Sequence, residues 1–471
     1  MGDERELLRR TAELAADFVE SLDERSVWPR ATVDELRDAL GGPLPDDASA
    51  PLDVVESLAR AADPGIVGMQ SGRYFGFVIG GSLPAALAAD WLAATWDQNA
   101  GLVVGGPAAA VVEEVVGDWL KELLRLPRTA SFALVTGCQM AHTTCLAAAR
   151  HDVLSRSGWN VEHDGLTGAP PIRVLAGAKR HATIDRSLRL LGLGAGRTVE
   201  IPADDQGRMR VDALRAALGE SSGPAGSAPT IICAQVGEVN TGSVDPMSEI
   251  VELAGEADAW LHVDGAFGLW AAASPALRDL VAGVEHADSW ATDAHKWLNV
   301  PYDCGIAFVA NPESHRAAMA VQAEYLVQDR HAARDQMDWT PEFSRRARGF
   351  AVYAALRSLG RAGVAELVES SCARAKEFAD AIARLPECEV LNEVVLNQVL
   401  FRLSDDATTG EVLAAVQAEG EAWMSGTRWD DRAAIRLSVS NWRTSPADVG
   451  RTVASFERAL NARSAASGYA T

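Results

Sequence analysis

The feature that most constrains the fold is a regular alternation of short apolar runs with longer helical segments through the middle of the chain. Residues 230–235 and 260–263 are apolar almost throughout, which is typical of strands buried on both faces of a sheet. Strands that alternate with helices imply βαβ crossovers, so we predict an α/β protein with a mainly parallel central sheet and helices on both of its faces. The predicted strands are 132–136, 173–176, 198–201, 230–235, 260–263 and 305–309, and the predicted helices around them include 111–126, 140–154 and 183–191.

At 471 residues the chain is too long for one ordinary domain. Residues 1–75 carry apolar side chains at helical spacing, interrupted by prolines, which predicts an N-terminal helical arm. Residues 76–355 form the predicted large domain, and residues 356–471 form a predicted small α+β domain. The elements predicted in the small domain are a helix over 364–385, strands near 389–391, 398–403 and 435–439, and a last helix from Pro446.

Charge and cysteine content argue against several classes of protein. The formal net charge is −22, and such a surface repels nucleic acid and anionic lipid. The six cysteines occur singly, which disfavours a zinc ribbon or a disulfide framework and fits a reducing compartment. The chain has no uncharged apolar run long enough to span a membrane, and its first residues are too charged for a secretory signal. We therefore expect a cytoplasmic protein.

The sharpest candidate for chemistry is Lys296, in the run Thr-Asp-Ala-His-Lys-Trp-Leu-Asn at 292–299. The flanking His295 and Trp297 shield it from water, and desolvation lowers the pKa of a lysine. A free amine of this kind can form an imine with a carbonyl compound. The alternative is an ordinary lysine whose stem packs on Trp297, and this segment alone does not decide between the two.

Asp264 ends a predicted buried strand in the run Trp-Leu-His-Val-Asp-Gly-Ala at 260–266. The carboxyl end of a strand is where α/β folds place ligand-binding groups. A carboxylate there can pair with a protonated ring nitrogen, such as that of pyridoxal phosphate. One alternative is that Asp264 caps the following helix. A metal site formed with His262 is the other alternative, and we predict no metal because no third ligand follows at a convincing spacing.

The run Val-Thr-Gly-Cys-Gln at 135–139 joins a predicted strand to a predicted helix. Backbone N–H groups at a helix N-terminus bind phosphate, and Gly137 permits the tight turn, although many strand–helix turns look alike. The glycine-rich run at 192–196 follows a helix rather than a strand, so it does not indicate a nicotinamide cofactor. His181, also between a strand and a helix, can stack on a planar cofactor or serve as a structural hydrogen-bonding residue.

Together these motifs resemble the group II pyridoxal-phosphate-dependent amino-acid decarboxylases, which include the aromatic-amino-acid, glutamate, histidine and tyrosine decarboxylases. The runs at 262–266 and 293–305 are similar to the signature of that family, residues 73–91 to its segment for substrate access, and residues 435–449 to its C-terminal domain. The resemblance implies a fold-type I protein with pyridoxal 5'-phosphate as cofactor. It also implies a homodimer with shared active sites, in which the arm 1–75 embraces the partner.

The resemblance further implies a role for each candidate residue. Lys296 would hold the cofactor as a Schiff base, Asp264 would pair with the ring nitrogen, and His181 would stack on the ring and take part in proton transfer. The implied catalytic residues are Lys296, His181 and Asp264, and the implied cofactor-binding residues are these three with Gly137, Cys138, Gln139, Ala266, Asp293 and His295. The implied reaction is loss of the α-carboxylate from an L-amino acid.

Two departures from the family pattern bear on the reaction. Val239 stands where the family commonly has a threonine. The segment similar to the family's mobile lid, 328–339, lacks the tyrosine that protonates the carbanion; Tyr325 lies earlier, and His331 is a possible substitute. A lid without its acid can leave the carbanion open to oxygen, which would give an aldehyde in place of an amine.

The leading prediction is decarboxylation of an L-amino acid. Phe75, Phe77 and Trp91 favour an aromatic or apolar substrate, although they fit a role in the core equally well. Related pyridoxal-phosphate reactions remain as alternatives, namely decarboxylative oxidation to an aldehyde, aldehyde lysis and transamination. A protein of another class, which keeps the fold as a binding partner without turnover, is the remaining alternative.

Overall fold

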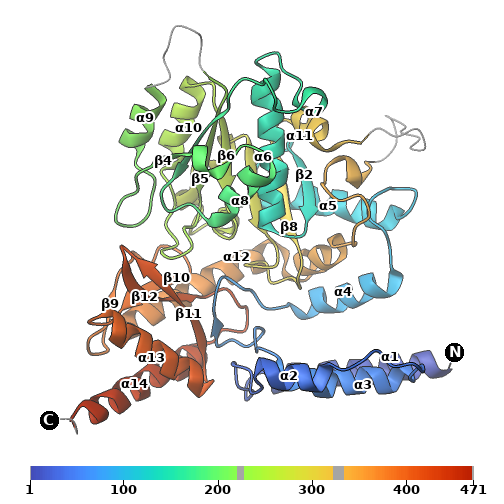
Figure 1. The fold of residues 1–471 in the computed structure, drawn as a ribbon, viewed down its shortest axis with the longest axis vertical. Coiled ribbons are helices and arrows are strands. Elements are labelled where there is room, and N and C mark those ends of the chain that lie inside the picture. Colours follow the sequence, from blue (N-terminus) through green and yellow to red (C-terminus); the bar gives the residue numbers. More distant parts are fainter. Residues whose placement is uncertain (1, 220–227, 322–333, 469–471) are drawn as a thin grey trace. The chain divides into compact units, whose positions relative to one another are not determined.

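The computed structural model describes residues 2–219, 228–321 and 334–468. They divide into two compact units, whose elements are labelled in Figure 1. The terminal unit comprises Met1–Ile79, Glu377–Leu391 and Leu400–Thr471, and the central unit comprises Gly80–Lys376 and Asn392–Val399. All candidate site residues lie in the central unit. The division of the sequence into three consecutive domains stays a prediction.

The central unit is built on a seven-stranded sheet with the order β2-β8-β7-β6-β5-β3-β4. The neighbours from β7 through β6, β5 and β3 to β4 pair in parallel, whereas β8 is antiparallel to both β2 and β7. This mostly parallel sheet confirms the predicted α/β class. The strands are β2 (Ser131–Val135), β3 (Arg173–Gly177), β4 (Val199–Ile201), β5 (Thr230–Gln235), β6 (Trp260–Asp264), β7 (Ser289–Asp293) and β8 (Gly305–Val309).

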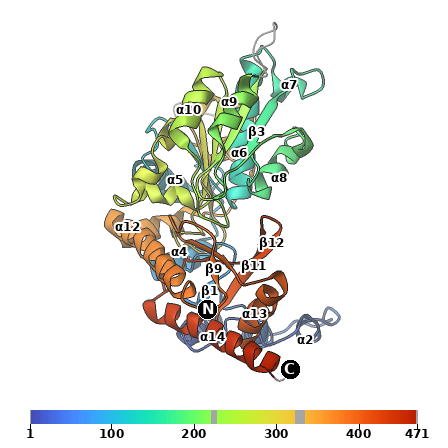
Figure 2. The ribbon, with the colours of Figure 1, turned by 90° about the vertical axis from the view of Figure 1, so that its left-hand side faces the viewer.

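Helices cover both faces of this sheet, as predicted. Figure 2 shows α8 and α10 on opposite sides of the strands. Helix α6 lies against β6, β7 and β8 and also contacts α8 and α11. The helices are α4 (Pro84–Trp96), α5 (Pro107–Leu123), α6 (Cys138–Ser155), α7 (Val161–Asp164), α8 (Ala182–Leu190), α9 (Val211–Gly219), α10 (Met247–Glu256), α11 (Pro312–Met319) and α12 (Gly349–Ile382), which runs on into the terminal unit.

Helix α6 packs closely on the sheet because small side chains form its inner face. Close packing of small residues lets a helix backbone approach the strands without leaving voids. The packing holds the first turn of α6 beside the carboxyl ends of β6 and β7. The buried residues at this contact include Ala141, Cys145, Ala148 and Ala149 of the helix and Val135, Ala291 and Ala307 of the strands.

The terminal unit contains a five-stranded sheet with the order β1-β11-β12-β10-β9. Its edge strand β1 comes from the N-terminal arm and pairs in parallel with β11. The buried guanidinium of Arg73, just before β1, donates hydrogen bonds to the carbonyl groups of Asp23 at 2.8 Å and Glu421 at 2.5 Å, which ties the two ends of the chain together. The elements are α1 (Gly2–Ser21), α2 (Val33–Leu40), α3 (Pro51–Ala62), β1 (Tyr74–Phe75), β9 (Glu389–Val390), β10 (Gln398–Arg402), α13 (Asp406–Glu419), β11 (Trp423–Trp429), β12 (Arg432–Ser438) and α14 (Pro446–Gly468).

Some elements differ from their sequence-based prediction. No strand is predicted for β7, because its sequence Ser-Trp-Ala-Thr-Asp has polar residues at both ends, yet all of β7 is buried. The helix predicted over 364–385 begins earlier, since α12 starts at Gly349 and continues past Gly360, whose φ of 61° is not helical. Among the described helices, none is long and apolar enough to cross a bilayer.

Candidate active site

Two neighbouring strands bring acidic residues to the same edge of the central sheet. Asp264 is the last residue of β6, and Asp293 is the last residue of β7. The parallel register places Asp264 opposite Ala291, and the Asp293 N–H donates to the carbonyl of Ala266 at 2.9 Å. The carboxyl ends of parallel strands are the usual ligand-binding edge of an α/β sheet. The candidate residues on these strands therefore meet where the sequence predicts a site.

Asp293 connects the lysine segment to the first turn of α6. Its Oδ1 accepts a hydrogen bond from the backbone N–H of Cys138 at 2.6 Å, and its Oδ2 lies 3.0 Å from Lys296 Nζ. The side chain is only 2% exposed. A buried carboxylate is stable at this position because the positive end of the α6 dipole and the lysine ammonium both face it.

Lys296 follows β7 directly and is partly buried, with 21% of its side chain exposed. Burial lowers the pKa of Lys296, but the charge of Asp293, the hydrogen bond to it and the charge of Asp264 raise it by more, so the net pKa lies above the ordinary lysine value. Desolvation does lower this pKa, but the expectation that the net pKa falls below the ordinary lysine value is wrong. The carboxylate of Asp293 outweighs the effect of burial, so Lys296 stays protonated as an ammonium.

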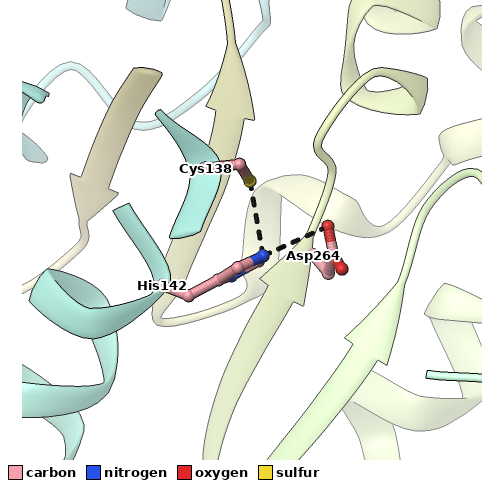
Figure 3. Close-up of side chains that lie close together, drawn as sticks. All are labelled: Cys138, His142 and Asp264. Atoms are coloured by element: carbon pink, nitrogen blue, oxygen red, sulfur yellow. Dashed lines mark hydrogen bonds and ion pairs between the residues drawn. The ribbon is translucent and has the colours of Figure 1, made fainter. Parts of the chain in front are cut away.

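The Asp264 carboxylate is also buried, yet it stays ionised. Its Oδ1 accepts the N–H of Ala266 at 3.1 Å and lies 3.5 Å from His142 Nε2, as Figure 3 shows for the histidine contact. Burial raises the pKa of Asp264, but His142, His181 and Lys296 lower it by more, and the net pKa lies well below the usual carboxyl range. This contact with Ala266 is a local turn, and Asp264 does not cap a regular α-helix.

His295 and Tyr302 form an aromatic pair beside the lysine. Their ring centroids are 4.4 Å apart, and the planes are inclined by 30°. His295 Nδ1 accepts the N–H of Cys304 at 3.1 Å, so its proton is on Nε2, which lies 3.5 Å from Asp293 Oδ1. Burial and the nearby Lys296 charge keep the pKa of His295 below its usual value. Burial raises the pKa of Tyr302 to about 12, so its hydroxyl keeps its proton.

The remaining candidates lie around this cluster with partners of their own. The side-chain nitrogen of Gln139 donates to Ser187 Oγ at 2.8 Å, so in this structure it points toward α8. His181 is exposed and caps α8, where its Nδ1 accepts the N–H of Thr183 at 3.3 Å. Ala266 is half-buried beside Asp264. The roles predicted for these residues toward a cofactor stay predictions.

Gly137, Gly305 and Gly80 permit close backbone approaches around the site. A Cβ at Gly137 would lie 3.2 Å from the His295 ring, and a Cβ at Gly305 would lie 2.3 Å from the carbonyl carbon of Gly137. A Cβ at Gly80 would lie 1.9 Å from the carbonyl oxygen of Lys296. Side chains larger than hydrogen would therefore push apart the turn before α6, strand β8 and the lysine segment.

His142 and Tyr302 also belong to the site, but their sequence motifs were not read as site residues. His142 lies one helical turn after Cys138 on α6, and this i, i+4 spacing is a signal that places both side chains on one face. Tyr302 lies in the run 293–305, which also contains Lys296 and resembles the family signature. Of the predicted lid, residues 328–333 lie outside the described residues, as do Tyr325 and His331.

Comparison with known proteins assigns the class of the protein. Residues 34–404 match the family model described as the pyridoxal-dependent decarboxylase conserved domain. The match covers well over half of the sequence, so the chain belongs to this family. This confirms the resemblance found in the motifs, pyridoxal phosphate as the cofactor, and the prediction of a pyridoxal-phosphate-dependent carboxy-lyase.

The relatives include enzymes with two kinds of product in their names. Tryptophan decarboxylase 1 of Oryza sativa subsp. japonica is 28% identical over 467 residues, which cover 93% of this chain and 90% of the relative. The 4-hydroxyphenylacetaldehyde synthase of Rhodiola rosea is 27% identical over 465 residues, covering 92% and 91%. The crystal structure of Oryza sativa TDC with PLP and tryptamine matches with a TM-score of 0.91 at 25% identity, covering 98% of both chains.

Proposed function

We propose that this protein removes the α-carboxylate of an L-amino acid with an aromatic or apolar side chain, with pyridoxal phosphate held covalently by Lys296. The observation that carries the proposal is the convergence of three groups in one partly buried cluster: the Lys296 amine, the Asp264 carboxylate and the first turn of α6. The relatives named for tryptophan and tyrosine decarboxylation support an aromatic substrate. Phe75 does not, since it is fully buried in the core of the terminal unit.

The residues present fit this cofactor. The N–H of Cys138 at the start of α6 already binds an anionic oxygen, that of Asp293, which shows that this turn accepts a negative charge. A glycine at 137 leaves the turn open, because a Cβ there would approach the His295 ring. The residues that would hold the cofactor are Lys296 at its aldehyde with His295 beside it, Asp264 at its ring nitrogen, Ala266 and His181 at its ring, and Gly137, Cys138, Gln139 and Asp293 on its phosphate side.

Each charged residue of the cluster has a defined task in the proposed reaction. When bound, pyridoxal phosphate supplies an electron sink for the bond that breaks at the α carbon. Asp264 stays ionised and so keeps the ring nitrogen that it faces protonated. Lys296 Nζ carries a proton stabilised by Asp293 and could donate it to a reacting atom held in the cluster.

Decarboxylative oxidation to an aldehyde is the second candidate function. It is favoured by the absence of tyrosine from residues 328–339 and by similarity to an aldehyde synthase across nearly the whole chain. In this reaction dioxygen and water are consumed, and one aldehyde, carbon dioxide, ammonia and hydrogen peroxide are formed. The proposed decarboxylation instead gives one amine and carbon dioxide, with a proton transferred to the α carbon.

A homodimer is part of the proposal. Helix α4 exposes Trp91, Leu92 and Trp96 by 41%, 47% and 49%, and contiguous exposed apolar side chains mark protein interfaces. The loop that leads into α4 packs on the lysine segment, where Asn299 Oδ1 accepts the N–H of Gly81 at 2.7 Å. A second copy seated on α4 would therefore lie beside the site, which fits active sites shared between subunits.

The test is to incubate the purified protein with each common L-amino acid and to measure carbon dioxide, amine, aldehyde and peroxide. We expect carbon dioxide in equal amount with an amine from an aromatic amino acid; equal amounts of aldehyde and peroxide would identify the second candidate. Borohydride reduction should fix the cofactor to the peptide containing Lys296. The Lys296→Ala variant should lose this adduct and at least about a thousandfold of the activity, whereas exposed Lys376→Ala should keep both. An adduct elsewhere would contradict the assignment of Lys296.

A further inference from the structure

A chain of buried polar side chains lies behind Asp264. His142 Nδ1 is 2.9 Å from His262 Nε2, and His262 Nδ1 is 2.9 Å from Ser289 Oγ. These three side chains are fully buried, and they come from three elements, α6, β6 and β7. Figure 3 shows the end of this row of side chains nearest Asp264, with His142 placed between Cys138 and Asp264. Buried polar groups of this kind cost stability unless each one has a partner.

The hydrogen-bond donors in this row of side chains are all directed toward Asp264. The indole N–H of Trp260, which can only donate, is 2.9 Å from Ser289 Oγ, so it occupies a lone pair of the serine. The serine hydroxyl hydrogen is then available for His262. Burial, with the neighbouring His142, lowers the pKa of His262 to about 3, so this ring is neutral and carries one proton. We assign Ser289 as the donor to His262 Nδ1 because the ionised Asp264 at the other end of the series can only accept; the His262 proton is then on Nε2 and is donated to His142.

The His142 ring then accepts at Nδ1 and carries its proton on Nε2, which faces Asp264 Oδ1 at 3.5 Å. We propose that His142 is a positioning residue, which donates toward Asp264 Oδ1 and so orients the carboxylate with Oδ2 left for the cofactor ring nitrogen. His262 and Ser289 fix the tautomer of His142. The inference rests on the proposed pairing of Asp264 with that nitrogen. Its basis is that, among the described residues, the Ala266 N–H at 3.1 Å and His142 Nε2 at 3.5 Å both approach Oδ1; His142 Nε2 also lies 3.3 Å from Cys138 Sγ.

A metal centre is the competing explanation for this cluster. In the part of the chain that the structure describes, Cys138, His142 and Asp264 form a group with ligand atoms within 4.8 Å of one another. Without an ion, burial raises the pKa of the Cys138 thiol well above its usual value, so the thiol is protonated in the metal-free protein. Asp264 is also the carboxylate that the cofactor requires. A protonated thiol and a hydrogen-bonded carboxylate fit the positioning role better.

The experiment compares two substitutions of His142 in the full-length protein freed of cofactor. His142→Ala removes the donor, and His142→Gln keeps an acceptor for His262 and a donor for Asp264. The matched control is His315→Ala, since His315 is equally buried and hydrogen-bonded to Ser131 at 2.8 Å, outside the candidate site. Titration with pyridoxal phosphate gives the dissociation constant, thermal unfolding gives the stability, and ¹⁵N NMR of histidine gives the tautomers.

We expect His142→Ala to bind pyridoxal phosphate about tenfold or more weakly, as expected for loss of a hydrogen bond to a charged group. His142→Gln should recover most of the affinity, and His315→Ala should lose stability but not affinity. Wild-type histidine spectra should show His262 neutral with its proton on Nε2. Wild-type affinity in His142→Ala, or one equivalent of zinc that is lost with His142→Gln, would overturn the inference. A wild-type protein that holds the cofactor but releases no carbon dioxide would count against the proposed function alone.

Discussion

Asp293 determines the protonation of Lys296 more strongly than burial does. The two side chains are 3.0 Å apart, and the same carboxylate caps α6 through the Cys138 N–H. Burial alone would favour a neutral amine, and the pKa of Lys296 nevertheless lies above its ordinary value. Two opposing effects therefore act on one nitrogen, and the ion pair prevails because the carboxylate is itself shielded from water.

This balance predicts the behaviour of Asp293→Asn. An asparagine keeps the hydrogen-bond acceptor for Cys138 but removes the charge, so the pKa of Lys296 should fall. Because a raised lysine pKa stabilises the fold below the unfolded value of about 10.4 and is lost above the folded value, the variant should also lose stability at neutral pH. Capture of pyridoxal phosphate at a fixed neutral pH should become faster, since more of the amine is free. Stopped-flow capture rates measured across pH would show this shift.

Asp338→Asn is the matched control for that prediction. Asp338 is a buried acid that pairs with Arg316 at 2.9 Å rather than with Lys296. Its substitution should affect stability but leave the pH profile of cofactor capture unchanged. An identical profile in Asp293→Asn and the wild type would mean that Asp293 does not set the pKa of Lys296.

At the scale of single residues, the sequence predicts those site residues whose position follows from their neighbours along the chain. Asp264 could be found because it adjoins the end of a predicted strand, and Lys296 because of its flanking residues and the run 293–305, although its strand β7 was not predicted. His142 could not be assigned a role, because its partners His262 and Asp264 lie on a distant strand and only the packing of α6 brings them together. The sign of the Lys296 pKa shift could not be predicted either, since it depends on the orientation of Asp293.

At the scale of elements, the contact between β8 and the turn before α6 controls the shape of the site. In Gly305→Ala the new methyl group would lie 2.3 Å from the Gly137 carbonyl carbon, which is backbone and cannot move aside cheaply. Overpacking of this kind costs about 1–3 kcal/mol. We expect lower unfolding free energy by urea titration and weaker binding of pyridoxal phosphate, because the turn proposed to hold the phosphate is displaced.

Gly255→Ala tests whether the stability loss in Gly305→Ala comes from the close contact with Gly137 or from replacing a glycine as such. Gly255 lies in α10, and nothing approaches the position of its Cβ within 4 Å. Alanine is a better helix former than glycine by about 1 kcal/mol, so this variant should be as stable as the wild type or more stable. Equal stabilities of the two variants would contradict the packing argument.

Strands with a clear apolar pattern were predictable, and strands without one were not. The bounds predicted for β5 and β8 agree with the structure, because both are apolar runs that end at polar or glycine residues. Strand β7 could not be predicted because its composition is not typical of a strand; it is a fully buried strand between β6 and β8. The two-residue β1 is also invisible in sequence, since it exists only through pairing with β11, more than three hundred residues away.

At the scale of the whole molecule, the exposed apolar side chains of α4 are the proposed contact with a partner, and we predict that this partner is a second copy of this chain. Leu92→Glu would place a charge in that interface, where it has no partner, and burial of an unpaired charge is costly. Sedimentation velocity should show a dimer for the wild type and a monomer for Leu92→Glu. Leu190→Glu on α8, whose leucine is 63% exposed outside this face, should remain dimeric. A monomeric wild type, or an intact dimer in Leu92→Glu, would rule out α4 as the contact.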